Sequence, residues 1–102
     1  MYVALVGDEV VGLIAGHLSR RFGCQAELEW IDVHATHRGT GVGDELLRRL
    51  AGWLVELGAA RVCVDAAPDN ARARGFYDRH GARELAPSWM VWDDISVVLP
   101  GG

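Results

Sequence analysis

The hydrophobic pattern of this chain changes its period once, and a glycine-rich run lies at the change. Up to Val33 the apolar residues form short runs that are typical of β-strands. From Asp44 onward the apolar residues recur at the spacing of one helical face, at Leu46, Leu47, Leu50, Trp53, Leu54 and Leu57. The run Arg38-Gly39-Thr40-Gly41-Val42-Gly43 separates the two patterns. Any fold of this chain must therefore turn tightly between a strand and an amphipathic helix.

Turn and cap residues predict the remaining elements. The predicted strands are Tyr2 to Val6, Val10 to Leu18, Gln25 to Val33, Arg61 to Ala66, Arg83 to Leu85 and Trp89 to Trp92; a second helix runs from Asn70 to about His80. Alternation in the third strand places Leu28, Trp30 and Asp32 on one face and Glu27, Glu29, Ile31 and Val33 on the other. The order β-β-β-α-β-α-β-β, without repeats or a linker, predicts one α+β domain over residues 1–102.

Composition excludes several classes of function. The 102 residues are half apolar and carry a net charge of −4, which argues against a nucleic-acid surface. The longest apolar stretch, Val10 to Gly16, is far shorter than the roughly 20 residues of a membrane helix, and no signal peptide is visible. Cys24 and Cys63 lack metal-ligand spacing, so we expect buried thiols in a reducing cytoplasm and no metal site.

The glycine-rich run suits an anion. Glycine lets the backbone approach a ligand closely, and the free amides of a helix N-terminus favour negative charge. The alternative is a turn that only connects strand to helix. No Gly-Lys-Ser/Thr follows, which excludes a Walker P-loop, and three strands precede the run, unlike a Rossmann fingerprint.

Two motifs together carry a resemblance to a known family. Arg38, Gly41 and Gly43 form Arg-x-x-Gly-x-Gly, which resembles the coenzyme A pyrophosphate loop of GNAT N-acetyltransferases. Asn70, Ala73, Tyr77 and Gly81 then reproduce the family's Asn-x-x-Ala-x-x-x-Tyr-x-x-x-Gly helix. The resemblance spans about Val3 to Trp92 and implies a mixed, largely antiparallel sheet with a central pair of parallel strands that splay apart.

The resemblance also implies acetyl-CoA as cosubstrate, wedged between the third and fourth strands. Ile31 and Val33 would pair with the pantetheine arm through their backbones, the loop amides would hold the pyrophosphate, and Asn70 would fix the splayed strand and the arm. The complete set of cofactor-binding residues that it implies is Ile31, Asp32, Val33, Arg38, Gly39, Thr40, Gly41, Val42, Gly43, Asp44 and Asn70.

Direct acetyl transfer needs a base for the amine and an acid for the leaving thiolate. By resemblance Tyr77 faces the sulfur as general acid; the alternative is that Tyr77 only packs in the core. Glu27 lies where histone-type members keep a catalytic glutamate, and Asp65 lies where ribosomal-protein-type members keep theirs. We rank Glu27 first as base, with Asp65 second, while Glu29 could relay through water and many relatives use a water chain instead.

By the same resemblance, we expect the chain to start at the family's second strand, without the usual first strand and two helices. Two functions therefore stay open: an N-acetyltransferase acting on a small-molecule or protein amine, or a non-catalytic coenzyme A-binding module or fragment of a larger acetyltransferase.

The edge strand Tyr2 to Val6 invites pairing, so we expect a homodimer through the N-terminal hairpin or a C-terminal strand at Val97 to Leu99. The alternative is a monomer whose tail, Ser96 to Gly102, folds back.

Overall fold

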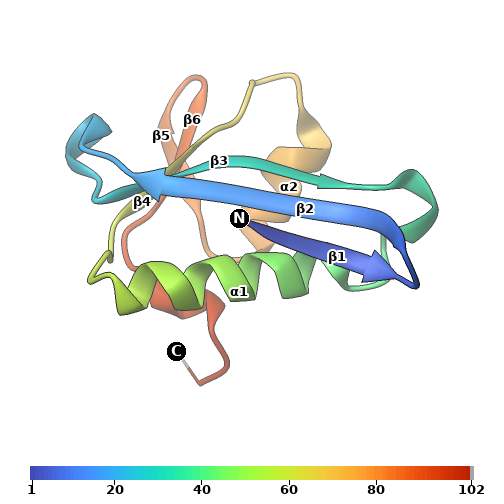
Figure 1. Cartoon of the computed structure of the whole chain (residues 1–102). Coiled ribbons are helices and arrows are strands. Elements are labelled where there is room, and N and C mark those ends of the chain that lie inside the picture. Colours follow the sequence, from blue (N-terminus) through green and yellow to red (C-terminus); the bar gives the residue numbers. More distant parts are fainter. Residues whose placement is uncertain (102) are drawn as a thin grey trace.

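The computed structural model describes residues 1–101 as two α-helices on a six-stranded sheet (Figure 1). The strands are β1 (Tyr2–Val6), β2 (Glu9–Leu18), β3 (Ala26–Val33), β4 (Val62–Asp65), β5 (Arg83–Ala86) and β6 (Trp89–Trp92), and the helices are α1 (Val42–Glu56) and α2 (Ala71–Arg79). Their spatial order is β1-β2-β3-β4-β6-β5, and only β3 and β4 run parallel. The predicted element order and the central parallel pair are confirmed.

Helix α1 packs directly on the backbone of β2. Its apolar stripe, Leu46, Leu47, Leu50, Ala51 and Leu54, is buried. Two glycines of β2 make this close approach possible: a Cβ at Gly12 would lie 3.1 Å from Leu46, and one at Gly16 would lie 3.1 Å from Leu50. The helix ends before Gly58, which has the positive φ of a helix stop, as the sequence predicted.

A β-bulge at Glu29 changes which face of β3 each side chain occupies. Ala15 pairs with Trp30 and Gly16 with Leu28, so Glu29 is the extra residue. Leu28 is buried against α1, whereas Trp30 is 61% exposed on the opposite face. The prediction that these two residues share a face is therefore wrong. The inserted residue breaks the alternation of side chains between the two faces, so the pattern before the bulge does not predict the faces after it.

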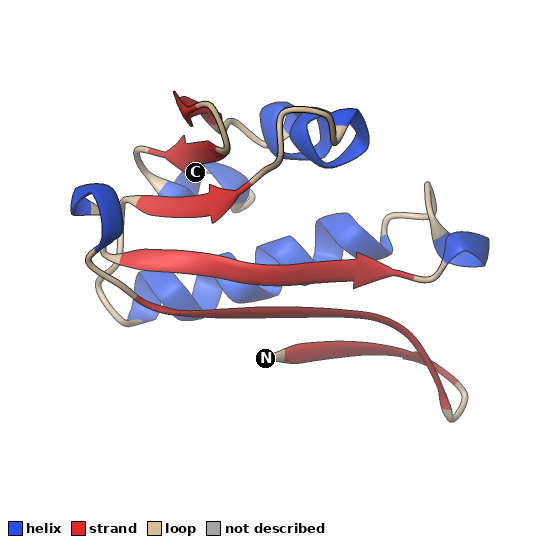
Figure 2. Cartoon of the chain, turned by 90° about the horizontal axis from the view of Figure 1, so that it is seen from above, coloured by secondary structure: helices blue, strands red, loops and turns tan. Residues whose placement is uncertain are grey.

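Beyond the bulge, β3 continues without β4. The two parallel strands pair only from Ala26–Val62 to Leu28–Val64, and β3 then runs on to Val33 with its β4 side free (Figure 2). The predicted splay is thus present, and it opens the sheet toward α2.

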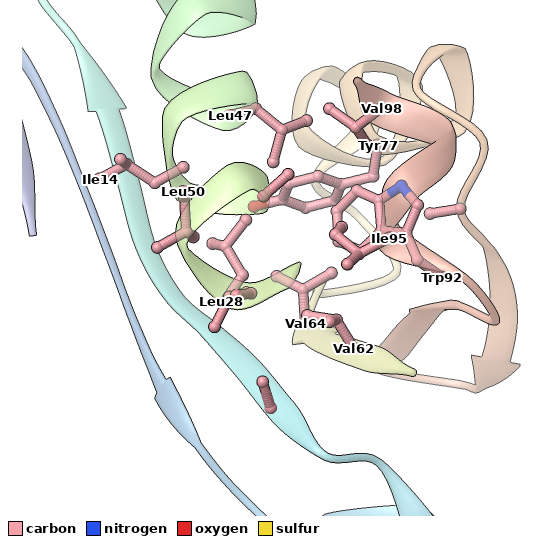
Figure 3. Close-up of a cluster of buried hydrophobic side chains, with 14 of the residues drawn as sticks. Ile14, Leu28, Leu47, Leu50, Val62, Val64, Tyr77, Trp92, Ile95 and Val98 are labelled. Carbon is pink, nitrogen blue, oxygen red and sulfur yellow. The ribbon is translucent and has the colours of Figure 1, made fainter. Parts of the chain in front are cut away.

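One apolar core fills the space between the sheet and the helices (Figure 3). Tyr77 of α2 packs edge-on against Trp92, with ring centroids 5.8 Å apart. The segment Ile95–Val98 is a 3₁₀ helix and not the strand expected at Val97 to Leu99. Asp94 caps this turn by accepting a hydrogen bond from the Ser96 amide, and Ile95 and Val98 are buried in the core. The segment Ile95–Val98 therefore packs back onto the core.

The other face of the sheet carries a smaller cluster of Cys24, Cys63 and Val91, to which neither α-helix contributes. Both cysteines are free and buried, as predicted. Burial, reinforced by a hydrogen bond with Cys24, raises the pKa of Cys63 to about 12, so its thiol stays protonated. Among residues 1–101 no helix is long and apolar enough to cross a membrane.

The packing of α1 on β2 can be tested by comparing two glycine-to-alanine substitutions, one at the contact and one outside it. Gly16→Ala would place a Cβ 2.9 Å from the backbone oxygen of Glu27, and overpacking of this kind costs about 1–3 kcal/mol. Gly52→Ala in α1 meets nothing within 4 Å and should stabilise by about 0.5–1 kcal/mol through helix propensity. Urea unfolding would measure both, and equal effects of the two substitutions would contradict this packing.

Candidate active site

The glycine loop turns the chain from β3 into α1 with two residues in the left-handed region. Gly39 has φ +79° and Gly41 has φ +90°, conformations that a side chain would strain. Gly41 is the N-cap of α1 and provides no side-chain acceptor. The first amides of α1 therefore remain free to donate to a ligand.

The loop is tied back to the end of β3. Arg38 Nε donates to the backbone oxygen of Val33 at 3.2 Å, and the Thr40 hydroxyl donates to the backbone oxygen of His37. The first bond ties the loop to the end of β3, and the second closes a turn within the loop.

Helix α2 forms the other wall. Asn70 caps it by accepting a hydrogen bond from the Ala73 amide at 3.2 Å, as the sequence predicted. Phe76 packs against the loop, since a Cβ built on Gly43 would lie 3.3 Å from its ring.

A cleft of about 610 Å³ opens between these walls. It brings together most of the residues that the sequence singled out: Ile31, Asp32, Val33, Arg38, Gly39, Gly41, Gly43, Asp44, Asp65, Asn70 and Tyr77. Thr40, Val42 and Glu27 do not line it. Residues from β3, the loop, β4 and α2 thus share one cavity.

Tyr77 belongs both to this cleft and to the core. Its side chain is only 5% exposed, and its ring points toward α1 and β3 (Figure 3). Burial, with a smaller contribution from the charge of Asp65, raises the pKa of Tyr77 above its ordinary value of 10.0. The phenol is therefore protonated at neutral pH, as a proton donor must be.

The two candidate bases lie in different surroundings. Asp65, at the end of β4, lines the cleft with Tyr77. Glu27 lies outside the cleft, where its carboxylate accepts a hydrogen bond from Ser19 at 2.8 Å and lies 3.3 Å from Arg21 Nε. His17 Nε2 is 3.5 Å from the same carboxylate. The carboxylate of Glu27 is thus engaged in a network of polar partners.

Several residues of the cleft were missed by the sequence reasoning. These residues are Arg72, Phe76 and Arg79. They are spaced by four and then three residues, which places all three on one face of α2. This spacing was visible in the sequence, but only the packing of α2 on the loop turns that face toward the cleft. Among residues 1–101 no group of three or more potential ligands is arranged to hold a metal ion.

A family model of the Acetyltransferase (GNAT) family matches residues 1–82. The fold is also similar to solved structures. For PH1933 from Pyrococcus horikoshii OT3 the TM-score is 0.78 at 23% identity, over 88% of this chain and 62% of that one. For Ard1 from Thermoplasma volcanium the TM-score is 0.75 at 26% identity, over 88% of this chain and 66% of that one.

A third similar structure contains coenzyme A. PaiA N-acetyltransferase from Thermoplasma acidophilum, in complex with coenzyme A, matches with a TM-score of 0.76 at 14% identity, over 90% of this chain and 58% of that one. The present chain thus spans 58% to 66% of the lengths of these three proteins. With four-fifths of its residues matched by the family model and its fold shared with these structures, the chain belongs to the GNAT acetyltransferase family.

Proposed function

We propose that this chain is an N-acetyltransferase that moves the acetyl group of acetyl-CoA to an amine of a small molecule or a protein. The observation that carries the proposal is the shared cleft: the glycine loop lies along it, and Tyr77 and Asp65 line it as well. The family membership supports acetyl transfer in general, and the residues named here refine it for this chain.

The cleft fits coenzyme A. A Cβ on Gly39 or Gly41 would meet no protein atom within 4 Å, so the backbone is open where a diphosphate would approach. On the β4 side β3 has no strand partner at Ile31 and Val33, where only the Val33 oxygen is bonded, by Arg38, so this edge can accept the pantetheine arm as an added strand. The volume, about 610 Å³, lies within the usual range of ligand pockets.

The reaction begins with a neutral amine. An alkyl ammonium with a pKa near 10.4 is neutral only about 0.04% of the time at pH 7, so a positioned base contributes strongly. We assign Asp65 this role in place of Glu27, because Asp65 lines the cleft while the Glu27 carboxylate is engaged by Ser19, Arg21 and His17. The amine proton passes to Asp65, directly or through water.

The amine nitrogen then attacks the thioester carbonyl carbon; the C–N bond forms, the C–S bond breaks and the electron pair leaves on sulfur. Tyr77 donates its phenolic proton to the thiolate. The amide nitrogen sheds its second proton as the C–S bond breaks, and that proton passes through water to the phenolate and restores Tyr77. With a thiol pKa near 8.5 and a phenol pKa above 10, this transfer costs at least about 2 kcal/mol. Because the pKa of Tyr77 is raised, turnover should not be lost through phenol ionisation until the pH exceeds 10.

Binding and turnover should separate in two variants. Tyr77→Phe should lower kcat by about 10²-fold, as expected for a lost general acid, with little change in Kd for acetyl-CoA. Gly41→Asp should abolish binding, since it strains a positive φ and puts negative charge beside the phosphates. Calorimetry and thiol release with a panel of primary amines would measure both, and Gly52→Ala, outside the cleft, serves as control.

Wild-type protein should gain about 2.7 kcal/mol of stability at a hundred times the Kd. No heat and no thermal shift at millimolar acetyl-CoA would contradict the proposal. Binding without turnover on any amine would instead favour the non-catalytic coenzyme A-binding module.

The assignment of the base predicts unequal effects of two isosteric substitutions. Asp65→Asn should lower kcat/KM by on the order of 10²-fold at pH 7. This loss should shrink as the pH approaches the pKa of the amine acceptor, because the amine is then neutral without a base. Glu27→Gln should mainly reduce stability, because it weakens the contacts with Arg21 and His17. A folded Glu27→Gln variant with the larger kinetic defect would overturn the assignment.

We also propose that two copies associate through β1, one of the two end strands of the sheet. Tyr2–Val6 contains no charged residue, and Val3, Leu5 and Val6 are exposed. Native edge strands are usually guarded by charge, and in a chain of net charge −4 this uncharged edge is where a second, like-charged copy can approach. The C-terminal segment offers no strand for such pairing, because Ile95–Val98 is a 3₁₀ helix with Val98 buried.

Light scattering should therefore give about twice the 11.1 kDa of one chain at micromolar concentration. Val3→Lys places a charge on the edge and should shift the mass to that of a monomer without lowering the melting temperature. A wild-type mass of 11.1 kDa at all concentrations would contradict the dimer.

A further inference from the structure

The arginines of this chain divide into two groups. Six lie within ion-pair distance of carboxylates: Arg21, Arg48, Arg49, Arg61, Arg74 and Arg83. The other four, Arg20, Arg38, Arg72 and Arg79, form no ion pair with residues 1–101, and the last three of these line the cleft. Guanidinium groups without a carboxylate partner are therefore concentrated where the proposed cosubstrate would lie.

Two of these arginines share one face of α2. Arg72 and Arg79 are seven residues apart, which corresponds to about 10 Å along a helix. Phe76 lies between them on that face and packs against Gly43 of the loop, while the Arg79 guanidinium carbon is 5.7 Å from the centre of the Phe76 ring. Arg79 is thus held close to the first turn of α1.

One of the acidic residues that line the cleft, Asp44, is already engaged by a partner. Asp44 lies in the first turn of α1, where its charge would oppose a phosphate. His80 Nε2 lies 2.7 Å from Asp44 Oδ1, so this carboxylate has a partner within the protein. Because neither Arg72 nor Arg79 pairs with a carboxylate among residues 1–101, the Arg72–Phe76–Arg79 face keeps the positive charges of both arginines.

We propose that Arg72 and Arg79 bind the 3′-phosphate of the coenzyme A nucleotide and make the protein selective for the 3′-phosphorylated cosubstrate. The inference rests on the proposed function, in which the loop amides take the diphosphate. The remaining phosphate is a monoester with close to two negative charges at pH 7. Arginine matches phosphate with paired N–H donors, and each such charged hydrogen bond contributes roughly 10- to 100-fold in affinity.

The test compares coenzyme A with 3′-dephospho-coenzyme A by calorimetry at fixed ionic strength. Wild-type protein should bind coenzyme A at least about 10-fold more tightly. The double variant Arg72→Gln/Arg79→Gln should lose that preference through weaker binding of coenzyme A, while its affinity for the dephospho form stays within about two-fold. Arg20→Gln, which changes an arginine outside the cleft, should leave both affinities unchanged.

The other outcomes are distinguishable. If the double variant bound both ligands more weakly by the same factor, the arginines would act on the diphosphate, and the inference would be overturned. A double variant that kept the wild-type preference for coenzyme A would overturn it as well. If wild-type protein bound neither ligand, the proposed function itself would fail. Because Arg72 and Arg79 are exposed and form no ion pair within residues 1–101, the double variant should keep the wild-type melting temperature.

Discussion

The short parallel pairing between β3 and β4 determines the architecture of the site. Three residue pairs join these strands, and the bulge at Glu29 lies directly after the last of them on β3. The rest of β3 therefore lacks a strand partner on the β4 side, where Arg38 Nε donates a hydrogen bond to the backbone oxygen of Val33. The glycine loop at the end of β3 and α2 after β4 border the same opening. A longer ladder between the two strands would close it.

Tyr77 shows how closely the site and the core are joined. Its ring packs with Trp92 and Phe76, and it is almost fully buried, yet it also lines the cleft. The same burial keeps the phenol protonated by raising its pKa. Packing and proton donation are therefore compatible roles, and only a substitution that keeps the ring, such as phenylalanine, can separate them.

The features that sequence predicted are those decided locally. The loop glycines, the Asn70 cap and the stop at Gly58 each depend on residues within one turn. The bulge at Glu29 depends on register with β2, which no local pattern in β3 reveals. Val97 to Leu99 reads as a strand by composition, but the Asp94 cap and burial against α1 wind the segment into a 3₁₀ helix. The unequal surroundings of Glu27 and Asp65 likewise arise from contacts across strands.

The two faces of the sheet are unequally covered, and this bears on how an acceptor would be recognised. The cleft is built from β3, the loop, β4 and α2, all within this chain. On the opposite face neither α-helix contributes to the apolar cluster, and Trp30 is exposed beside Asp32. Under the proposed function, the amine must reach Asp65 at the rim between these faces. Acceptor selectivity then depends on what lies over the open face, and pairing through the edge strand β1 would lengthen the sheet without covering that face.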